Sequence, residues 1–285
     1  MSQPPLSAID LHTHSTASDG TLSPSALVAH AHAAGVRTLA LTDHDCTDGI
    51  AEAQHRAAAL GMRLVPGTEI SVRWERRTLH VLALNPDIDD PTLRAGLDQQ
   101  AASRDARARA IGHRLDKLGI AGAYEGARSL AAESMITRAH FARHLVAAGH
   151  CPDMNSAFKR WLGNGKRANV SADWAPLEDV LDWIGAAGGI AVLAHPTTYG
   201  LTGARMRRLL DAFSQTGGAA MEVVCGNAHP SVVETLAGYA RRFGLAASVG
   251  SDFHTPDNPW VQPGRLRALP SGLQPVWELD AFAPA

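Results

Sequence analysis

The sequence predicts a barrel-like α/β fold that is interrupted by a helical insertion. Short apolar runs alternate with helical patterns in the first third and in the last part of the chain, which is typical of βαβ units and a parallel sheet. About seven such runs occur, and this number fits a barrel better than an open sheet. Several runs end in a histidine or a carboxylate, as expected where a barrel collects its strand ends at one face.

The first 90 residues contain strands and helices in alternation. Ser23 and Pro24 begin the first helix, as an N-cap and a proline at the first helical position, and Gly35 ends it. The second helix, 50–60, ends at Gly61. Strands are expected at 8–11, 38–41 and 63–66, followed by a strand pair at 70–72 and 78–84 that is joined through a charged turn at 74–77.

The segment from about 91 to 167 has almost no strand pattern. Helices are expected there at 93–118, 127–132, 137–148 and 155–162. Alternation then resumes, with helices at 176–187, 205–216 and 231–243 and strands at 190–193, 220–224 and 245–250. We therefore predict a discontinuous barrel domain, 1–90 and 168–285, and a helical insertion domain, 91–167, that covers the site.

Composition and charge are those of an ordinary globular protein. Hydrophobic residues make up 45% and charged residues 19% of the chain, and the formal net charge is −2. This charge argues against a broad nucleic-acid-binding surface, although a local basic groove stays open. Three widely spaced cysteines, no signal-peptide pattern and no long uncharged apolar stretch predict a cytoplasmic protein without a membrane partner. The sequence indicates no obligate protein partner.

Histidines and carboxylates recur at the ends of the expected strands. His12 and His14 are two residues apart, so on a strand they point to one side, and Asp252 and His254 can do the same. Asp43 and His44 are adjacent, so one is expected to be a ligand and the other to support it or to orient a neighbour. A catalytic zinc ion takes three protein ligands, whereas a larger set of donors indicates two or three ions with shared carboxylates. The candidate ligands are His12, His14, Asp19, His44, Glu69, His80, His195, Asp252 and His254.

The prediction of a metal site depends on the repetition of histidines and carboxylates at several strand ends, because a single histidine at a strand end is more often structural than a ligand. The mixed imidazole and carboxylate set suits manganese, with zinc or iron as alternatives, and it lacks the thiolates of purely structural zinc sites. No phosphate loop, GxSxG elbow or cysteine–histidine pair is present. The histidines in helical patterns are assigned to surfaces or local packing: His30, His32, His55, His113, His140, His144 and His150.

Five motifs together resemble those of the polymerase and histidinol phosphatase (PHP) family of metal-dependent phosphoesterases. They are HxHxxxxDG at 12–20, TDHD at 42–45, PGxE at 66–69, AHP at 194–196 and GSDFH at 250–254. The resemblance covers roughly 1–90 and 168–265 and implies a distorted (β/α)7 barrel. It also implies three ion sites: His12, His14, Glu69 and Asp252; Glu69, His80 and His195; and Asp19, His44 and His254.

The chain is most similar to a subgroup of this family that has a helical insertion after the fourth strand. Its members remove the 3′-phosphate from nucleoside 3′,5′-bisphosphates such as adenosine 3′,5′-bisphosphate, or act as 5′-to-3′ exonucleases on RNA or short oligonucleotides. The resemblance therefore implies a bisphosphate phosphatase, with the exonuclease and a histidinol-phosphate-type phosphatase as alternatives. A non-catalytic metal-dependent scaffold would need missing ligands, and none is missing.

Hydrolysis is expected to use a metal-bound hydroxide near Glu69, with Asp43 hydrogen-bonded to a ligand histidine. Arg138 stands at an expected helix start, where backbone N–H groups also favour anions, and is a candidate for binding a second phosphate. Lys159, Lys166 and His229 are further substrate-binding candidates. Each of these four residues also has a plain structural interpretation, as a helix-start or surface residue.

Overall fold

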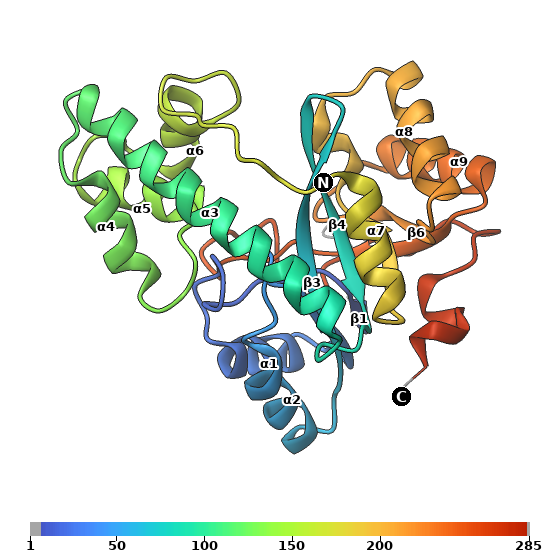
Figure 1. Ribbon diagram of the computed structural model, residues 1–285. Helices are drawn as coiled ribbons and strands as arrows, with labels where there is room; N and C mark the ends of the chain where they lie inside the picture. Colours follow the sequence, from blue (N-terminus) through green and yellow to red (C-terminus); the bar gives the residue numbers. More distant parts are fainter. Residues whose placement is uncertain (1–6, 284–285) are drawn as a thin grey trace.

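The computed structural model describes residues 7–283. Its strands form one sheet in which each strand lies beside its neighbours in the sequence (Figure 1). No helix in this described part of the chain combines the length and apolar character that a membrane span requires. The strands are β1 (Ile9–Asp10), β2 (Thr38–Leu41), β3 (Arg63–Trp74), β4 (Arg77–Leu84), β5 (Ile190–Leu193), β6 (Ala220–Cys225) and β7 (Ala246–Gly250).

The sheet closes on itself into a nearly complete barrel. β1 and β7, the two ends of the strand order, are joined by a hydrogen bond from the Leu11 N–H to the Val249 carbonyl (3.0 Å). Thr13 and Phe253 form a further parallel bridge just beyond these strands. The predicted barrel of seven strands is therefore confirmed.

The sheet is parallel except at β4, the second strand of the pair that is expected to be joined through the charged turn at 74–77. β4 runs antiparallel to both β3 and β5, whereas the other neighbouring strands are parallel. A turn of two residues, Glu75 and Arg76, joins β3 to β4, and so short a turn can connect only antiparallel strands. The expected strands 63–66 and 70–72 are also one continuous strand, so Glu69 lies within β3 and not at a strand end.

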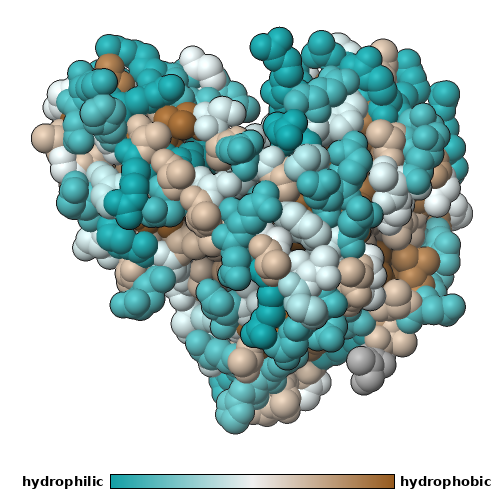
Figure 2. Space-filling view, in the orientation of Figure 1, coloured by the Kyte–Doolittle hydropathy of each residue, from teal (hydrophilic) through white to brown (hydrophobic). Residues whose placement is uncertain are grey.

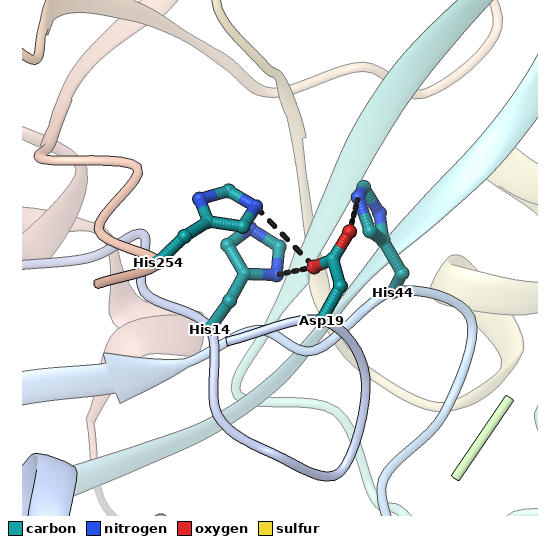
Figure 3. A group of neighbouring side chains, drawn as sticks. All are labelled: His14, Asp19, His44 and His254. Carbon is teal, nitrogen blue, oxygen red and sulfur yellow. Dashed lines mark ion pairs between the residues drawn. The ribbon is translucent and has the colours of Figure 1, made fainter. Parts of the chain in front are cut away.

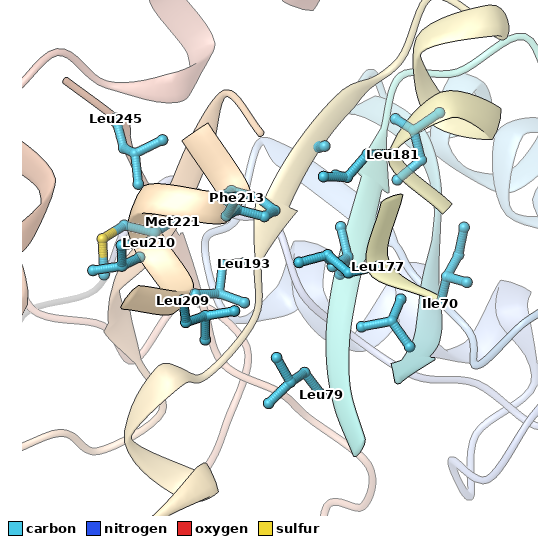
Figure 4. Packing of buried hydrophobic residues seen from close by; sticks show 14 of the residues in the cluster. Ile70, Leu79, Leu177, Leu181, Leu193, Leu209, Leu210, Phe213, Met221 and Leu245 are labelled. Atoms are coloured by element: carbon cyan, nitrogen blue, oxygen red, sulfur yellow. The ribbon is translucent and has the colours of Figure 1, made fainter. Parts of the chain in front are cut away.

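Helices cover the outside of the barrel. Side chains from β3 to β7 pack outward against α7 (Leu177–Ala186), α8 (Gly203–Gln215) and α9 (Pro230–Phe243) in the largest hydrophobic core (Figure 4). A second core packs β2 against α1 (Pro24–Ala33) and α2 (Ile50–Ala59). Alternate strand residues, such as Leu82 and Val192, fill the barrel interior. Short helical turns also occur: η2 (Pro196–Tyr199), η3 (Val276–Glu278) and η4 (Asp280–Phe282).

The insertion is helical, as expected, and contains its own hydrophobic core, which includes Phe141, Leu145 and Trp161. In Figure 1 it forms the green lobe beside the barrel. The expected helix 155–162 is a short α-helix followed by a π-helix. The elements are α3 (Pro91–Lys117), α4 (Ala123–Ala131), α5 (Arg138–Ala147), α6 (Met154–Ala157) and the π-helix η1 (Phe158–Leu162).

α3 links the barrel and the insertion. Its first turns contribute Leu93 and Leu97 to the barrel core, whereas Ala108 and Ile111 belong to the core of the insertion. A domain division at residue 91 therefore remains a proposal, because one continuous helix crosses it. The surface is hollowed between the two lobes (Figure 2).

Candidate metal centre

The side chains predicted as metal ligands lie together at one end of the barrel. They come from the segments that follow β1, β2, β5 and β7 and from positions within β3 and β4. Their ligand atoms form four overlapping groups, within each of which the atoms lie within 4.8 Å of one another. The groups are His14, Asp19, His44 and His254; His12, Glu69 and His195; His12, His14 and Asp252; and His44, Glu69 and His80.

Glu69 lies at the centre of this cluster. Its buried carboxylate is 2.9 Å from His44 Nδ1, 2.8 Å from His80 Nδ1 and 2.7 Å from His195 Nε2. β3 brings Glu69 here because it continues past the end of β2, where the Glu69 N–H donates to the Asp43 carbonyl (3.1 Å). A carboxylate that belongs to two of the four groups is placed as a bridging ligand would be.

His12 and His14 point toward each other from the segment that follows β1. Their Nε2 atoms are 3.1 Å apart, and Asp252 Oδ1 lies 3.4 Å from the first and 3.3 Å from the second. Glu222 accepts a hydrogen bond from His12 Nδ1 (2.9 Å), which leaves the lone pair of His12 Nε2 available to a cation.

Asp19 gathers three histidines on the other side of the cluster (Figure 3). Asp19 Oδ1 is 3.3 Å from His254 Nε2 and 3.9 Å from His14 Nδ1, and Asp19 Oδ2 is 3.8 Å from His44 Nε2. Among residues 7–283, the buried atoms His14 Nδ1, Asp19 Oδ1 and His44 Nδ1 make no hydrogen bond of suitable geometry, although oppositely charged atoms of the cluster lie within 4 Å of each. Because buried polar atoms are normally paired, this arrangement suits a cation that would satisfy them.

The ionisation states also suit cations. Burial alone would raise the pKa values of Asp19, Glu69 and Asp252, but the surrounding histidines hold all three well below their usual range. Burial lowers the pKa of His80 to about 4, so its imidazole is neutral and can donate a lone pair. The neighbouring carboxylates raise the pKa values of His12, His14, His195 and His254, that of His254 to about 10, so a cation bound there would have to displace protons from these imidazoles.

Two of the predicted ligands have unusual backbone conformations. His195 has a φ of 26° and Asp252 a φ of 57°, in the left-handed region that favours glycine. Such conformations cost about 1–3 kcal/mol each and are found where function requires them. Here they turn the chain directly after β5 and β7, so that both side chains reach the cluster.

Glu222 was not predicted from the sequence, although it supports the cluster directly. It lies on β6, is fully buried, and contacts His12 Nδ1 and the backbone N–H of His195. The sequence does contain an indication of it, because Glu222 is the one charged residue in the apolar strand Ala220–Cys225. A carboxylate that is buried in such a strand rarely lacks a partner. Glu222 thus orients one predicted ligand and the chain that carries another.

Replacing Glu222 with alanine is expected to weaken manganese binding by about 10–100-fold, the usual effect of losing a residue that orients a ligand. Titration of the metal-free protein with Mn²⁺ measures this. Glu222→Gln retains an oxygen that can accept from His12 Nδ1, so its affinity should lie between those of Glu222→Ala and the wild type. Unchanged manganese affinity in Glu222→Ala, with an unchanged circular dichroism spectrum, would contradict the assigned role.

Asp43 does not contact a histidine as predicted. Its carboxylate accepts from Ser15 N–H (2.8 Å), Ser15 Oγ (2.6 Å) and Ser18 Oγ (2.5 Å), the contacts found for it within the described residues. The reason is geometric, since adjacent residues point in opposite directions and His44 faces the cluster. Asp43 therefore holds the loop that carries Asp19.

An arginine from the insertion is fixed to the barrel beside the cluster. Arg104 of α3 donates through Nε to Asp45 Oδ2 (2.6 Å) and through Nη2 to Ser71 Oγ (3.1 Å). Asp45 also accepts from the Ser71 N–H (2.6 Å) and stands next to His44. Sequence reasoning did not identify Arg104, because the chain contains many arginines and nothing in the pattern distinguishes this one.

The cluster opens into a cavity of about 1090 Å³ between the barrel and the insertion. Arg104, Arg107, Arg138 and Arg143 contribute to its wall on the side of the insertion. Arg138 lies at the start of α5, directly after the N-cap Thr137, and lines this cavity. The predicted ligands that line the cavity are Asp19, His44, Glu69, His80, His195, Asp252 and His254, whereas His12 and His14 are fully buried.

The other substrate-binding candidates are not placed as predicted. Lys159 and Lys166 are exposed and are not among the residues that line the cavity, so they belong to a solvated basic surface. His229 is exposed and is the N-cap of α9, where its side chain accepts from the Ser231 N–H. The positions of Lys159, Lys166 and His229 therefore support their interpretation as surface or helix-start residues.

Comparison with known proteins agrees with this geometry. Residues 10–184 match the model of the PHP domain. The chain is 47% identical over 270 residues to a 5′-3′ exoribonuclease of Haemophilus influenzae, covering 94% of this chain and 97% of the relative. It is 44% identical over 275 residues to a 3′,5′-nucleoside bisphosphate phosphatase of Chromobacterium violaceum, covering 96% of each chain. The structure of an amidohydrolase from Chromobacterium violaceum, with bound sulfate and no metal, superimposes with a TM-score of 0.91 at 43% identity and 95% coverage of both chains. The chain therefore belongs to the PHP domain family.

Proposed function

We propose that this protein is a metal-dependent phosphoesterase that hydrolyses the 3′-phosphate of nucleoside 3′,5′-bisphosphates, such as adenosine 3′,5′-bisphosphate, to the 5′-monophosphate and phosphate. One observation carries this proposal: the predicted metal ligands and a set of arginines line the same cavity. A substrate with two phosphates can place one at each of them. Relatives of the chain include a protein named for this activity.

The cluster is proposed to hold two or three divalent ions, with Glu69 shared between two groups of ligands. Ions bound there would activate water and neutralise charge on the phosphoryl oxygens. The protein's own residues arrange this site: β3 fixes Glu69, and Asp43 holds the loop of Asp19. Manganese is the proposed metal, because imidazole with carboxylate suits it and no thiolate is among the donors.

The arginines are proposed to bind the second phosphate. Within the described part of the chain, the guanidinium of Arg138 makes no hydrogen bond or ion pair with the protein, and that of Arg107 donates only to the Val170 carbonyl. Burial, together with Arg138 and Arg104, lowers the pKa of Arg107 to about 9. Because several cations there lack counter-charges, an anion would relieve their repulsion, and a phosphate can bind arginine in a bidentate manner.

A second candidate is 5′-to-3′ exonuclease activity on RNA or short oligonucleotides. The cavity, at about 1090 Å³, lies at the upper end of the range of about 300–1,000 Å³ usual for small-molecule pockets, so it also has room for the end of an oligonucleotide. A 5′-phosphorylated oligonucleotide could place its first 3′-phosphate at the cluster and its 5′-phosphate at the arginines. A relative named as a 5′-3′ exoribonuclease supports this alternative.

A substrate panel tests the proposal. The manganese-loaded protein is assayed with adenosine 3′,5′-bisphosphate, 3′-AMP, 5′-AMP, histidinol phosphate and a 5′-phosphorylated RNA trimer. We expect kcat/KM for the bisphosphate to exceed that for 3′-AMP by about tenfold or more, the contribution of one charge-assisted contact. Equal values would overturn recognition of a second phosphate, and faster release of nucleotides from the trimer would favour the exonuclease.

A further inference from the structure

The far wall of the cavity has a different chemistry from the metal cluster and the arginines. It is formed by the end of the insertion, where Met154, Asn155, Phe158 and Asn164 line the cavity. Phe158 is half-buried, and the two asparagines are exposed. In Figures 1 and 2 the end of the insertion that carries α6 lies beside the hollow between the lobes.

Phe158 begins the π-helix η1. π-helices are rare, and they occur frequently at functional sites because the wider turn redirects a side chain. Neither Asn155 nor Asn164 has a side-chain hydrogen bond to any residue between 7 and 283, so their amide groups can serve a ligand. An amide side chain offers both a donor and an acceptor, as the edge of a nucleobase does.

Arg138 connects this wall to the metal cluster. Its guanidinium carbon lies 5.9 Å from the centroid of the Phe158 ring. Arg138 and Asp19 also line the same cavity. Asp19 of the cluster, Arg138 and Phe158 thus line one cavity, so that a ligand whose ribose carries two phosphates and a base could contact all three.

We propose that Phe158, with the amides of Asn155 and Asn164, forms a nucleobase-binding subsite, in which the base stacks on the ring while Arg138 binds the phosphate of the same nucleotide. This inference rests on the proposed nucleotide substrate and adds to it the group that distinguishes a nucleotide from other phosphate esters. Stacking of a base on an aromatic ring contributes to binding without selecting a particular base.

The test compares two substrates and four forms of the manganese-loaded protein: the wild type, Phe158→Leu, Phe158→Tyr and Tyr124→Leu. The substrates are adenosine 3′,5′-bisphosphate and a methyl riboside 3,5-bisphosphate, which has both phosphates and no base. Phe158→Leu keeps an apolar side chain against the insertion core but removes the aromatic face, and Phe158→Tyr keeps that face. We expect Phe158→Leu to lower kcat/KM for the nucleotide about tenfold and to leave kcat/KM for the base-free substrate unchanged. Phe158→Tyr should have the kcat/KM values of the wild type for both substrates.

Tyr124→Leu is the matched control. Tyr124 is a half-buried aromatic residue of the same insertion with an arginine, Arg109, 5.2 Å above its ring, but it does not line the cavity. This variant should treat both substrates as the wild type does. Calorimetric titration of each metal-free protein with 5′-AMP provides a second measurement, in which only Phe158→Leu should bind more weakly, by a similar factor.

Three results would overturn the inference. If Phe158→Leu lowered kcat/KM by the same factor for both substrates, Phe158 would have a structural role only. If the wild type had equal kcat/KM values for both substrates, the base would not be recognised. In either case the proposed phosphatase activity would stand. If the wild type hydrolysed neither bisphosphate, the proposed function would fail together with this inference.

Discussion

Replacing Glu69 with alanine is expected to reduce phosphoesterase activity by at least about a thousandfold, because metal ions contribute several kcal/mol to the stabilisation of transition-state charge. No other predicted ligand contacts as many partners: the Glu69 carboxylate lies within 3.4 Å of nitrogen atoms of His12, His14, His44, His80 and His195. Its loss would therefore disturb two ion sites together. The measurement is kcat/KM for adenosine 3′,5′-bisphosphate, combined with the metal content of the purified variant.

Two further variants make this result interpretable. Glu69→Gln keeps the shape of the side chain and removes its charge, so it should also lose metal while retaining the fold. Glu234→Ala removes an exposed carboxylate from α9 and should retain full activity and full metal content. A Glu69→Ala protein that kept its metal and turned over within tenfold of the wild type would exclude Glu69 from the centre.

Replacing Arg138 with alanine is expected to lower kcat/KM for the bisphosphate by about 10–100-fold and to leave that for 3′-AMP almost unchanged. A hydrogen bond to a charged group contributes about 1.5–3 kcal/mol. Within the described residues the guanidinium of Arg138 lies over the Phe158 ring but makes no hydrogen bond or ion pair that would compete for a phosphate. The substrate that lacks a 5′-phosphate cannot use this contact. Steady-state kinetics with both substrates measure the ratio of the two effects.

Arg109→Ala is the control for this prediction. Arg109 lies on α3 near the arginines of the cavity wall, but it is exposed and pairs with Asp105 at 2.8 Å. Its replacement should change neither rate. If Arg138→Ala lowered kcat/KM for both substrates by the same factor, Arg138 would affect the arrangement of the cluster and would not bind the second phosphate.

The barrel and its cluster of donors could be predicted because both follow from short-range sequence patterns, namely residue spacing and the alternation of strands and helices. Residues two apart on an extended segment share a side, so the spacing of His12 and His14 is enough to pair them. Turn residues beside apolar runs marked the strands, and alternation of strands and helices indicated a barrel. Convergence of strand ends then followed from the topology alone.

The parts that could not be predicted depend on contacts between distant segments. Glu222 supports His12 from a strand more than two hundred positions away, and Arg104 reaches Asp45 from another lobe. Lys159, Lys166 and His229 show the opposite error, since their residue types suit phosphate but the chain places them on the surface. β3 is continuous through Gly67 and Thr68 because pairing with β4 holds these residues in an extended strand, which a local turn pattern does not reveal.

The central claim is that the clustered histidines and carboxylates hold divalent ions jointly, and the metal-to-protein ratio tests it most directly. The protein is loaded with manganese, freed of excess metal by gel filtration and analysed by inductively coupled plasma mass spectrometry. We predict about two or three ions per chain in the wild type, as expected for a multi-ion phosphoesterase site, and a clear loss in Glu69→Ala. A ratio near zero in the folded wild type, or an equal ratio in both proteins, would contradict the account.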